Sequence, residues 1–131
     1  MNTPYRIIIL EDLPSDAILV KRALKNFLGS CEFLVTDSKE EFVKGLNEFK
    51  PDIILSDFCI PGFDWFTAYK LTLNQTPKVP FIIVSGSTNP KIVSDCLNSG
   101  INDFISKDNI QELGPAILRA LEKRGVIHPM D

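Results

Sequence analysis

Short apolar runs recur along the chain and alternate with longer segments of mixed polarity. The runs are rich in β-branched and aromatic residues and occupy residues 6–10, 33–35, 52–55 and 81–84, with a weaker fifth run at 103–106. Three of these runs show no alternation of polar and apolar positions. Uninterrupted runs of this kind are typical of strands that are buried on both faces of a parallel sheet. The pattern therefore predicts five strands.

The segments between the runs carry the spacing of amphipathic helices. In the first segment, apolar positions follow Pro14 at helical intervals and the pattern ends at Gly29. The second segment begins with Ser38 and Glu41, which fit a capping box. Further helices are expected to begin near Phe66, at Asn89-Pro90 and at Gly114-Pro115. Proline suits the first turn of a helix, because the N–H that it lacks has no helical partner there.

The alternation of strands and helices predicts one α/β domain that covers residues 1–131. Strand–helix–strand units with right-handed crossovers give a parallel sheet that is covered by helices on both faces. We expect a flavodoxin-like (βα)5 three-layer sandwich, with five parallel strands in the order 2-1-3-4-5. In this order the first and third strands are neighbours. The sequence contains no linker, repeat or low-complexity segment.

Charge and cysteine content argue against several classes of protein. The formal net charge is −3 and no lysine or arginine run is longer than Lys123-Arg124, so we expect no nucleic-acid binding by this chain. The apolar residues near the N-terminus are too few for a signal peptide or a membrane span. The three cysteines form no C-x-x-C pair, as expected of reduced thiols. We therefore expect a cytoplasmic protein without a membrane partner.

Acidic residues follow the predicted strands that should lie side by side in the sheet. Glu11 and Asp12 come directly after the first strand, and Asp57 follows the third. Ligands of such folds bind beyond the carboxyl ends of the strands, so the three carboxylates should converge there. Two unit charges about 4 Å apart repel by roughly 4 kcal/mol at an effective dielectric constant near 20. A cation would relieve this repulsion, and Mg²⁺ favours such hard oxygen ligands.

Two further strands end in groups that suit a phosphoryl group. The fourth strand ends at Ser85 and the fifth at Lys107. An ammonium and a hydroxyl that face a carboxylate–metal site can balance the charge of a phosphoryl group and donate hydrogen bonds to it. Each residue alone has an ordinary explanation as a turn, cap or solvated residue. Four of the five strands, however, deliver a suitable group at the same end, and this joint pattern is far more specific.

These residues resemble a known family, the receiver domain of two-component response regulators, over essentially the whole chain. The segment LEDLPSD resembles the acidic-pair strand and first helix of that family, and KPDIILSDFCIPGFD resembles its phosphoacceptor strand and the loop that follows. PFIIVSG, LNSGINDFISKD and LGPAILRAL resemble the remaining blocks. The resemblance implies that Asp57 is the phosphoacceptor. It also implies that Glu11, Asp12, Asp57 and the main-chain carbonyl of Cys59 bind Mg²⁺ or Mn²⁺.

The same resemblance implies a switch. Ser85 corresponds to the switch hydroxyl, Lys107 to the phosphate-binding lysine, and Phe104 to the switch aromatic residue three positions before the lysine. The expected partner is a sensor histidine kinase or a phosphotransfer protein, which donates a phosphoryl group from a phosphohistidine. A downstream protein would bind the face formed by the fourth helix, fifth strand and fifth helix. The chain would catalyse only its own phosphorylation and dephosphorylation, and would not be a turnover enzyme.

Four positions depart from the common pattern of that family, and Cys59 matters least for metal binding because it would contribute only a carbonyl. Gly86 stands where alanine is usual, which is expected to loosen access to the phosphate. Asp108 replaces the proline that commonly follows the lysine, so the cis peptide bond expected there is in doubt, and a local cap with Gln111 is expected instead. Trp65 stands where glycine is frequent, and two interpretations remain open: a hydrophobic plug at the start of the third helix, or a contact with a partner.

Three alternative functions use a similar fold or nucleophile. A haloacid-dehalogenase-like phosphatase normally has a second acid two residues after its nucleophile, where this chain has Cys59. A flavodoxin would place the FMN phosphate against the acid cluster, and no Ser/Thr/Gly-rich loop follows the first strand. A degenerate receiver that acts only as a protein-binding scaffold remains possible from sequence, although every expected site residue is present.

Overall fold

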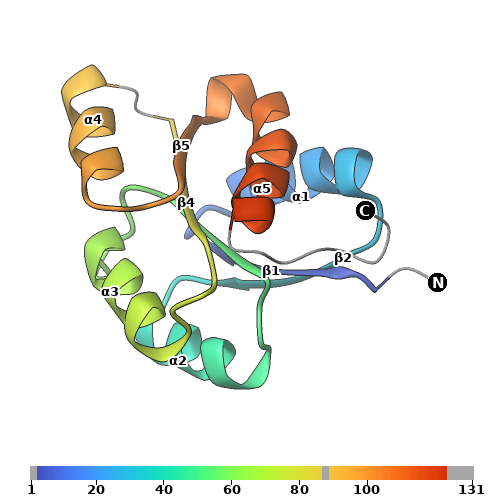
Figure 1. The fold of residues 1–131 in the computed structure, drawn as a ribbon, viewed down its shortest axis with the longest axis horizontal. Helices are drawn as coiled ribbons and strands as arrows, with labels where there is room; N and C mark the ends of the chain where they lie inside the picture. The colour runs from blue at the N-terminus through green and yellow to red at the C-terminus, as the bar shows by residue number, and fades with distance from the viewer. Residues whose placement is uncertain (1–2, 87–88, 124–131) are drawn as a thin grey trace.

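The computed structural model describes residues 3–86 and 89–123, which form five strands, five α-helices and one short 3-10 helix (Figure 1). The strands are β1 (Tyr5–Leu10), β2 (Cys31–Thr36), β3 (Ile53–Ser56), β4 (Phe81–Ser85) and β5 (Asp103–Ser106). The α-helices are α1 (Pro14–Leu28), α2 (Lys39–Glu48), α3 (Trp65–Gln75), α4 (Pro90–Asn98) and α5 (Leu113–Lys123). The 3-10 helix, Lys107–Glu112, joins β5 to α5.

All five strands are parallel and lie in the order β2-β1-β3-β4-β5, which confirms the predicted topology. At one edge of the sheet the register pairs Leu10 with both Thr36 and Ser56. At the same edge Ser85 pairs with Ser106. Because every strand points the same way, the residues that follow the strands gather at this edge. Glu11, Asp57 and Lys107 are therefore brought together by the topology.

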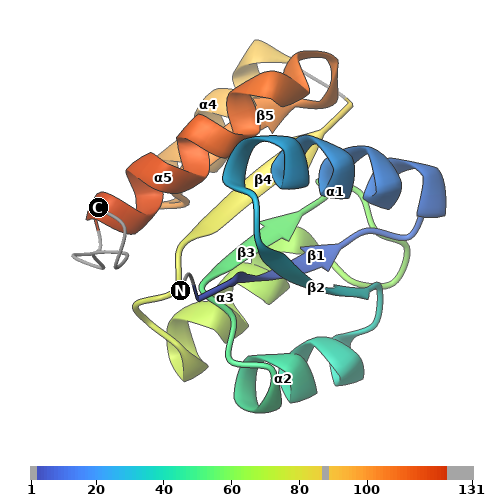
Figure 2. The same ribbon diagram turned by 90° about the vertical axis from the view of Figure 1, so that its right-hand side faces the viewer.

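The sheet has a separate hydrophobic core on each face. In β1, Ile7 and Ile9 pack toward α1 and α5, whereas Ile8 and Leu10 pack toward α2, α3 and α4. This alternation follows from the two-residue repeat of a strand. Figure 2 shows α1 and α5 on one side of the sheet and α2 and α3 on the other. Burial on both faces explains why the strands read as uninterrupted apolar runs.

Polar caps set the beginning of several helices. Ser38 Oγ accepts a hydrogen bond from the N–H of Glu41 at 3.2 Å, which is one half of the predicted capping box. The other half is replaced, because Glu41 Oε2 accepts from Thr36 Oγ1 at 3.0 Å and the N–H of Ser38 donates to that hydroxyl. Asn89 caps α4 through the N–H groups of Lys91 and Ile92, as the sequence predicted.

The connection from β5 to α5 differs from the expected one. Ser106 Oγ accepts from the N–H of Asp108 at 3.1 Å and so caps the 3-10 helix, whereas a cap formed by Asp108 with Gln111 was predicted. That prediction is wrong because the hydroxyl two residues earlier already satisfies this N–H. All peptide bonds of the described residues are trans. The helix α5 begins one residue before the predicted start at Gly114.

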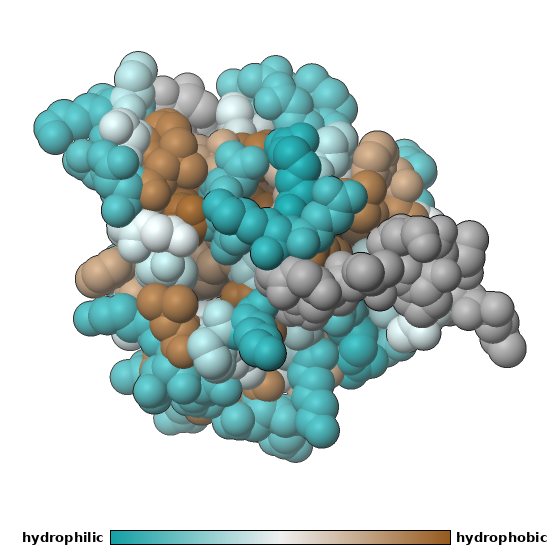
Figure 3. All heavy atoms as spheres, viewed as in Figure 1, coloured by the Kyte–Doolittle hydropathy of each residue, from teal (hydrophilic) through white to brown (hydrophobic). Residues whose placement is uncertain are grey.

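The face of the molecule seen in Figure 3 is mainly hydrophilic, and the hydrophobic residues on it form a few separated areas. Among the residues that the structure describes, no helix combines the length and the apolar character needed to cross a membrane.

Candidate functional site

The main chain at the ends of β1 and β3 places the acidic residues. The N–H of Glu11 donates to the carbonyl of Thr36 at 3.1 Å, and the N–H of Asp57 donates to the carbonyl of Leu10 at 2.9 Å. Both residues therefore continue the strand pairing one step beyond the sheet. Asp12 follows directly and is half-buried. Carboxylate oxygens of Glu11, Asp12 and Asp57 all lie within 4.8 Å of one another, in an arrangement that could hold a metal ion.

The two oxygens of Asp57 have different surroundings. Its Oδ1 accepts a hydrogen bond from the N–H of Phe58 at 2.8 Å, whereas Oδ2 faces Lys107 Nζ at 3.5 Å. Its side chain is 12% exposed, so it can be reached from outside. Asp12, Asp57 and Cys59 contribute to the lining of an open depression of about 610 Å³. The carboxylate of Asp57 is thus partly accessible and lies beside a space that a small anion or a metal ion can enter.

Glu11 is the most buried member of the acidic group, with 3% of its side chain exposed. Burial raises the pKa of Glu11 above the ordinary value, and the neighbouring charge of Asp57 acts in the same direction. Hydrogen bonds from Lys107 Nζ and from the N–H of Leu13 act against this increase. The raised pKa is the electrostatic cost of gathering carboxylates at a buried position.

Lys107 supplies a positive charge to this acidic group. Its Nζ donates hydrogen bonds to Glu11 Oε1 at 2.7 Å and to Asp16 Oδ2 at 2.8 Å. Burial acts to lower the pKa of Lys107, but these two hydrogen bonds and the nearby carboxylates outweigh it and raise the pKa above the ordinary value. The side chain therefore stays charged at neutral pH although only 11% of it is exposed.

Asp16 belongs to the same cluster and was not predicted from the sequence. It lies in the first turn of α1, four residues after Asp12. An acid at this place normally only complements the helix dipole, so its type and position carried no specific signal. The contact depends on the way that α1 is set against the β5 end, where Lys107 lies.

Ser85 lies on β4, which is next to β3, and Phe104 lies on β5, which follows β4 in the sheet. Ser85 is the last residue of β4 and is 3% exposed. Phe104 lies in β5, opposite Ile83 of β4, and its ring is partly buried against the core formed with α2, α3 and α4. The topology thus puts Ser85 at the carboxyl edge with Asp57 and Lys107, and Phe104 two residues before that edge of β5.

Trp65 is the first residue of α3 and lies beside the depression. Its ring stacks on Phe58 with centroids 6.3 Å apart, and it meets Phe66 edge-on at 5.5 Å. Asp64 caps the helix by accepting from the N–H of Phe66 at 3.3 Å. Trp65 is only half-buried. The Trp65 ring therefore takes part in a surface stack with Phe58, the residue that follows Asp57.

Comparison with known proteins decides the family of this chain. The sequence model of the response regulator receiver domain matches residues 7–118. The chain belongs to the receiver domain family of two-component response regulators. This receiver domain is 31% identical over 111 residues to the chemotaxis protein CheY of Listeria monocytogenes, a match that covers 82% of this chain and 91% of that protein.

Other relatives place the same domain in larger proteins. The two-component response regulator ORR1 of Oryza sativa subsp. japonica is 29% identical over 113 residues, with 78% of this chain and 48% of that protein covered. The receiver domain thus spans about half the length of this rice relative. A similar fold is found in the receiver domain of sensor histidine kinase PA1611 from Pseudomonas aeruginosa PAO1, with 21% identity, a TM-score of 0.76, and 92% and 99% of the two chains covered.

Family membership agrees with the presence of an acidic cluster in this chain. The chain is a CheY-like receiver domain of a signalling protein, and receiver domains bind Mg²⁺ at an acidic site. The structure of the PA1611 receiver domain has a magnesium ion coordinated in its active-site cleft. The present chain has its own cluster of three acidic residues at the carboxyl edge of the sheet. Family membership therefore favours the receiver interpretation over the phosphatase and flavodoxin alternatives.

Proposed function

We propose that Asp57 accepts a phosphoryl group from a phosphohistidine of a sensor histidine kinase or a phosphotransfer protein. The observation that carries this proposal is the convergence of Asp57 with Glu11, Asp12 and Lys107 at one edge of the sheet. Asp57 combines a partly exposed carboxylate with an adjacent cationic group, as a nucleophile for a charged phosphoryl group requires. We also propose that residues 1–131 form a single receiver domain located in the cytoplasm.

The divalent ion in this proposal is Mg²⁺ or Mn²⁺. Glu11, Asp12 and Asp57 would hold it together with the main-chain carbonyl of Cys59. Their oxygens are the hard ligands that these ions favour, and one ammonium does not neutralise the acidic group. When bound, the ion supplies positive charge for the transferring phosphoryl group.

The residues of the chain perform a transfer of the phosphoryl group from the histidine of the partner to Asp57. A carboxylate oxygen of Asp57 attacks the phosphorus atom, the phosphorus–nitrogen bond of the phosphohistidine breaks, and its electron pair returns to the imidazole nitrogen. Lys107 donates a hydrogen bond to a phosphoryl oxygen, and Ser85 donates another. Water later attacks the phosphorus atom, the bond between phosphorus and the Asp57 oxygen breaks, and inorganic phosphate is released as the carboxylate is restored. The chain would thus catalyse only its own phosphorylation and dephosphorylation.

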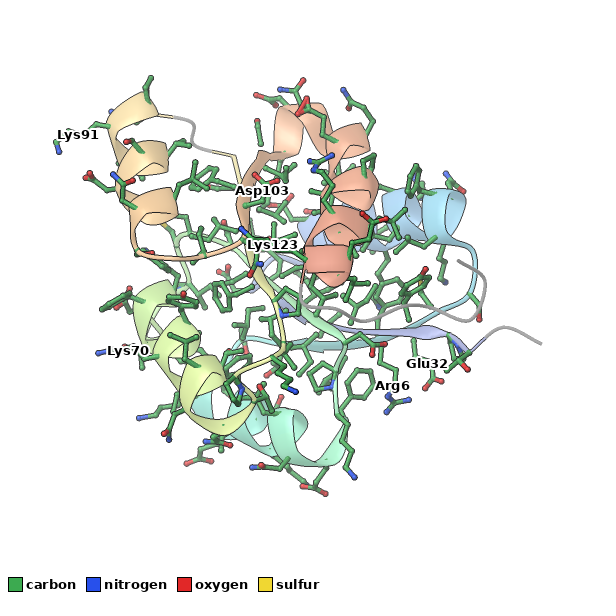
Figure 4. All side chains as sticks on the ribbon, in the orientation of Figure 1. Arg6, Glu32, Lys70, Lys91, Asp103 and Lys123 are labelled. Atoms are coloured by element: carbon green, nitrogen blue, oxygen red, sulfur yellow. The ribbon has the colours of Figure 1, made fainter. Side chains whose placement is uncertain are left out.

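Signalling would follow from movement of Ser85 toward the phosphoryl group and of Phe104 into the core. Asp103 lies directly before Phe104 in β5, and its Oδ1 accepts a hydrogen bond from the N–H of Phe104 at 2.8 Å. Asp103 Oδ2 also lies 3.5 Å from Arg119 on α5. Figure 4 labels Asp103 on β5. The contact of Asp103 with Arg119 connects β5 to α5, which supports the face formed by α4, β5 and α5 as the surface that binds a downstream protein.

Phosphorylation by a small donor tests the proposal. The purified chain is incubated with acetyl phosphate and Mg²⁺, and its intact mass is measured. We expect the mass to increase by one phosphoryl group in the wild-type chain, and no increase for Asp57→Asn or when EDTA replaces Mg²⁺. Asp95→Asn is the matched control, because Asp95 lies on α4 in an exposed pair with Lys91. Equal phosphorylation of the Asp57→Asn variant would refute the assignment.

A further inference from the structure

Asp16 contacts the predicted phosphate-binding lysine although it is not one of the predicted metal ligands. Its Oδ2 accepts a hydrogen bond from Lys107 Nζ at 2.8 Å, which is shorter than the 3.5 Å between that nitrogen and Asp57 Oδ2. Its side chain is 30% exposed, against 3% for Glu11. Lys107 is therefore held more closely by two other carboxylates than by the proposed phosphoacceptor.

The position of Asp16 is fixed by the start of α1. Pro14 is the first residue of the helix, and the N–H of Asp16 donates to the carbonyl of Leu13 at 3.1 Å. A lysine side chain, by contrast, has a flexible four-carbon stem and loses considerable rotamer freedom when its ammonium is held in one place. Asp16 thus offers an acceptor on a short side chain, with its main chain held in the helix, to a donor on a long and flexible side chain.

The ammonium of Lys107 has three N–H donors. Two of them are used in the short bonds to Glu11 and Asp16. The third N–H is left for a hydrogen bond on the side of the pocket where Asp57 Oδ2 lies. With both short bonds in place, the ammonium presents its remaining donor where a phosphoryl oxygen on Asp57 would need it. Such placement before the reaction lowers the entropy cost of the transfer.

We propose that Asp16 is a positioning residue that orients Lys107 toward the phosphoryl group, an inference that rests on Asp57 being the phosphoacceptor. Asp16 acts through Lys107 and has no contact with the phosphoryl group itself. If Asp16 orients Lys107, its removal should weaken anion binding. If Asp16 acted mainly as a negative charge near a bound anion, its removal would strengthen anion binding. The sign of the change therefore separates positioning from simple repulsion.

Binding of beryllofluoride with Mg²⁺ measures the effect without turnover, because BeF₃⁻ on an aspartate imitates a phosphoryl group. We expect Asp16→Ala to weaken BeF₃⁻ binding about tenfold, the equivalent of one charge-assisted hydrogen bond. Asp16→Asn keeps an acceptor oxygen in the same place and should recover much of this loss. Asp95→Ala, which removes an aspartate from the exposed pair with Lys91, should bind like the wild type. Tighter binding by both Asp16 variants would overturn the inference.

A double-mutant cycle with Lys107→Ala excludes a general structural effect. If Asp16 acts through Lys107, Asp16→Ala should change BeF₃⁻ affinity less than about twofold once the lysine has been removed. An equal loss with and without Lys107, or wild-type affinity of the single Asp16→Ala variant, would contradict the positioning role. Failure of the wild-type chain itself to bind BeF₃⁻ would instead count against the proposed function, so the two failures can be told apart.

Discussion

Lys107 is shared by several carboxylates in the pocket. It is hydrogen-bonded to Glu11 and Asp16 and lies 3.5 Å from Asp57. Before a metal ion binds, this ammonium offsets part of the repulsion among the acids. The residue is thus expected to have two roles, one in holding the metal-free pocket together and one in binding the phosphoryl group.

Replacement of Lys107 by Met tests the first role. The change keeps a long unbranched side chain but leaves the buried carboxylate of Glu11 without its closest partner. We expect the metal-free protein to lose roughly 1–3 kcal/mol of unfolding free energy, the usual cost of an unsatisfied buried group. Urea denaturation in EDTA measures this loss.

The matched control is Lys91→Met, which breaks an exposed pair with Asp95 on α4. Figure 4 shows Lys91 pointing away from the molecule. The change in unfolding free energy should stay within about 0.5 kcal/mol for this control. Equal urea midpoints for the wild type and Lys107→Met would contradict the stabilising role.

The three cysteines should react at different rates with an alkylating reagent. Burial raises the pKa of the Cys96 thiol, with a further contribution from the charge of Asp95, and burial also raises the pKa of Cys31. Cys59 is exposed beside Asp57. Since the thiolate is the reactive form, iodoacetamide at pH 8 should modify Cys59 first and Cys96 last. Peptide mass mapping over time measures the order, and persistence of the fast phase in Cys59→Ser would contradict it.

At the scale of elements, α1 and α5 approach closely at one glycine. A Cβ built on Gly114 of α5 would overlap the ring of Phe27 of α1 and lie in tight contact with its Cβ. The Phe27 ring cannot avoid this by moving only its outer atoms. We expect Gly114→Ala to destabilise the protein by roughly 1–2 kcal/mol, because the strain exceeds the gain in helix propensity. Urea denaturation checks this value.

Gly86→Ala provides the comparison, since a Cβ there meets no atom of the described residues within 4 Å and the backbone is outside the left-handed region. It should leave the unfolding free energy unchanged or raise it by up to about 1 kcal/mol. If Gly114→Ala were as stable as Gly86→Ala, the close packing of α1 against α5 would be in doubt.

Hydrophobic spacing was sufficient to predict the strands and helices, because burial on two faces leaves a distinct pattern in each strand. The strand at Asp103–Ser106 was predicted from only four residues and is confirmed. The 3-10 helix after it was missed, since its residues carry no apolar repeat and its cap depends on the single hydroxyl of Ser106. Local hydrogen bonds of this kind cannot be distinguished from ordinary turns in a sequence.

At the scale of the whole molecule, the acidic group lies at the ends of two central strands. Glu11 and Asp12 follow β1, Asp57 follows β3, and the two strands lie side by side. A metal ion that binds only the folded protein stabilises it by mass action. At a free Mg²⁺ concentration about a hundred times the dissociation constant, we expect a gain of about 2.7 kcal/mol in unfolding free energy.

Thermal denaturation with and without Mg²⁺ measures this gain. Asp12→Asn should lose most of the increase in melting temperature, whereas Asp95→Asn should keep it, because Asp95 lies on α4 outside the acidic group. An equal increase for both variants would mean that Mg²⁺ binds elsewhere.

The convergence of the acids could be predicted because the strand order alone brings Glu11, Asp12 and Asp57 to one edge. Asp16 could not be predicted in the same way, since its contact depends on the packing of a helix against the end of a distant strand. The roles of Ser85 and Phe104 remain predictions, because they concern a change of state.

Chemical mapping of the phosphorylated residue tests the central claim most directly. The chain is phosphorylated with acetyl phosphate and Mg²⁺, reduced with borohydride, which converts an aspartyl phosphate to homoserine, and digested for mass spectrometry. We expect homoserine at position 57 in samples with Mg²⁺ and none in samples with EDTA. Homoserine at another acidic position, or modification at 57 that is independent of the metal ion, would contradict that claim.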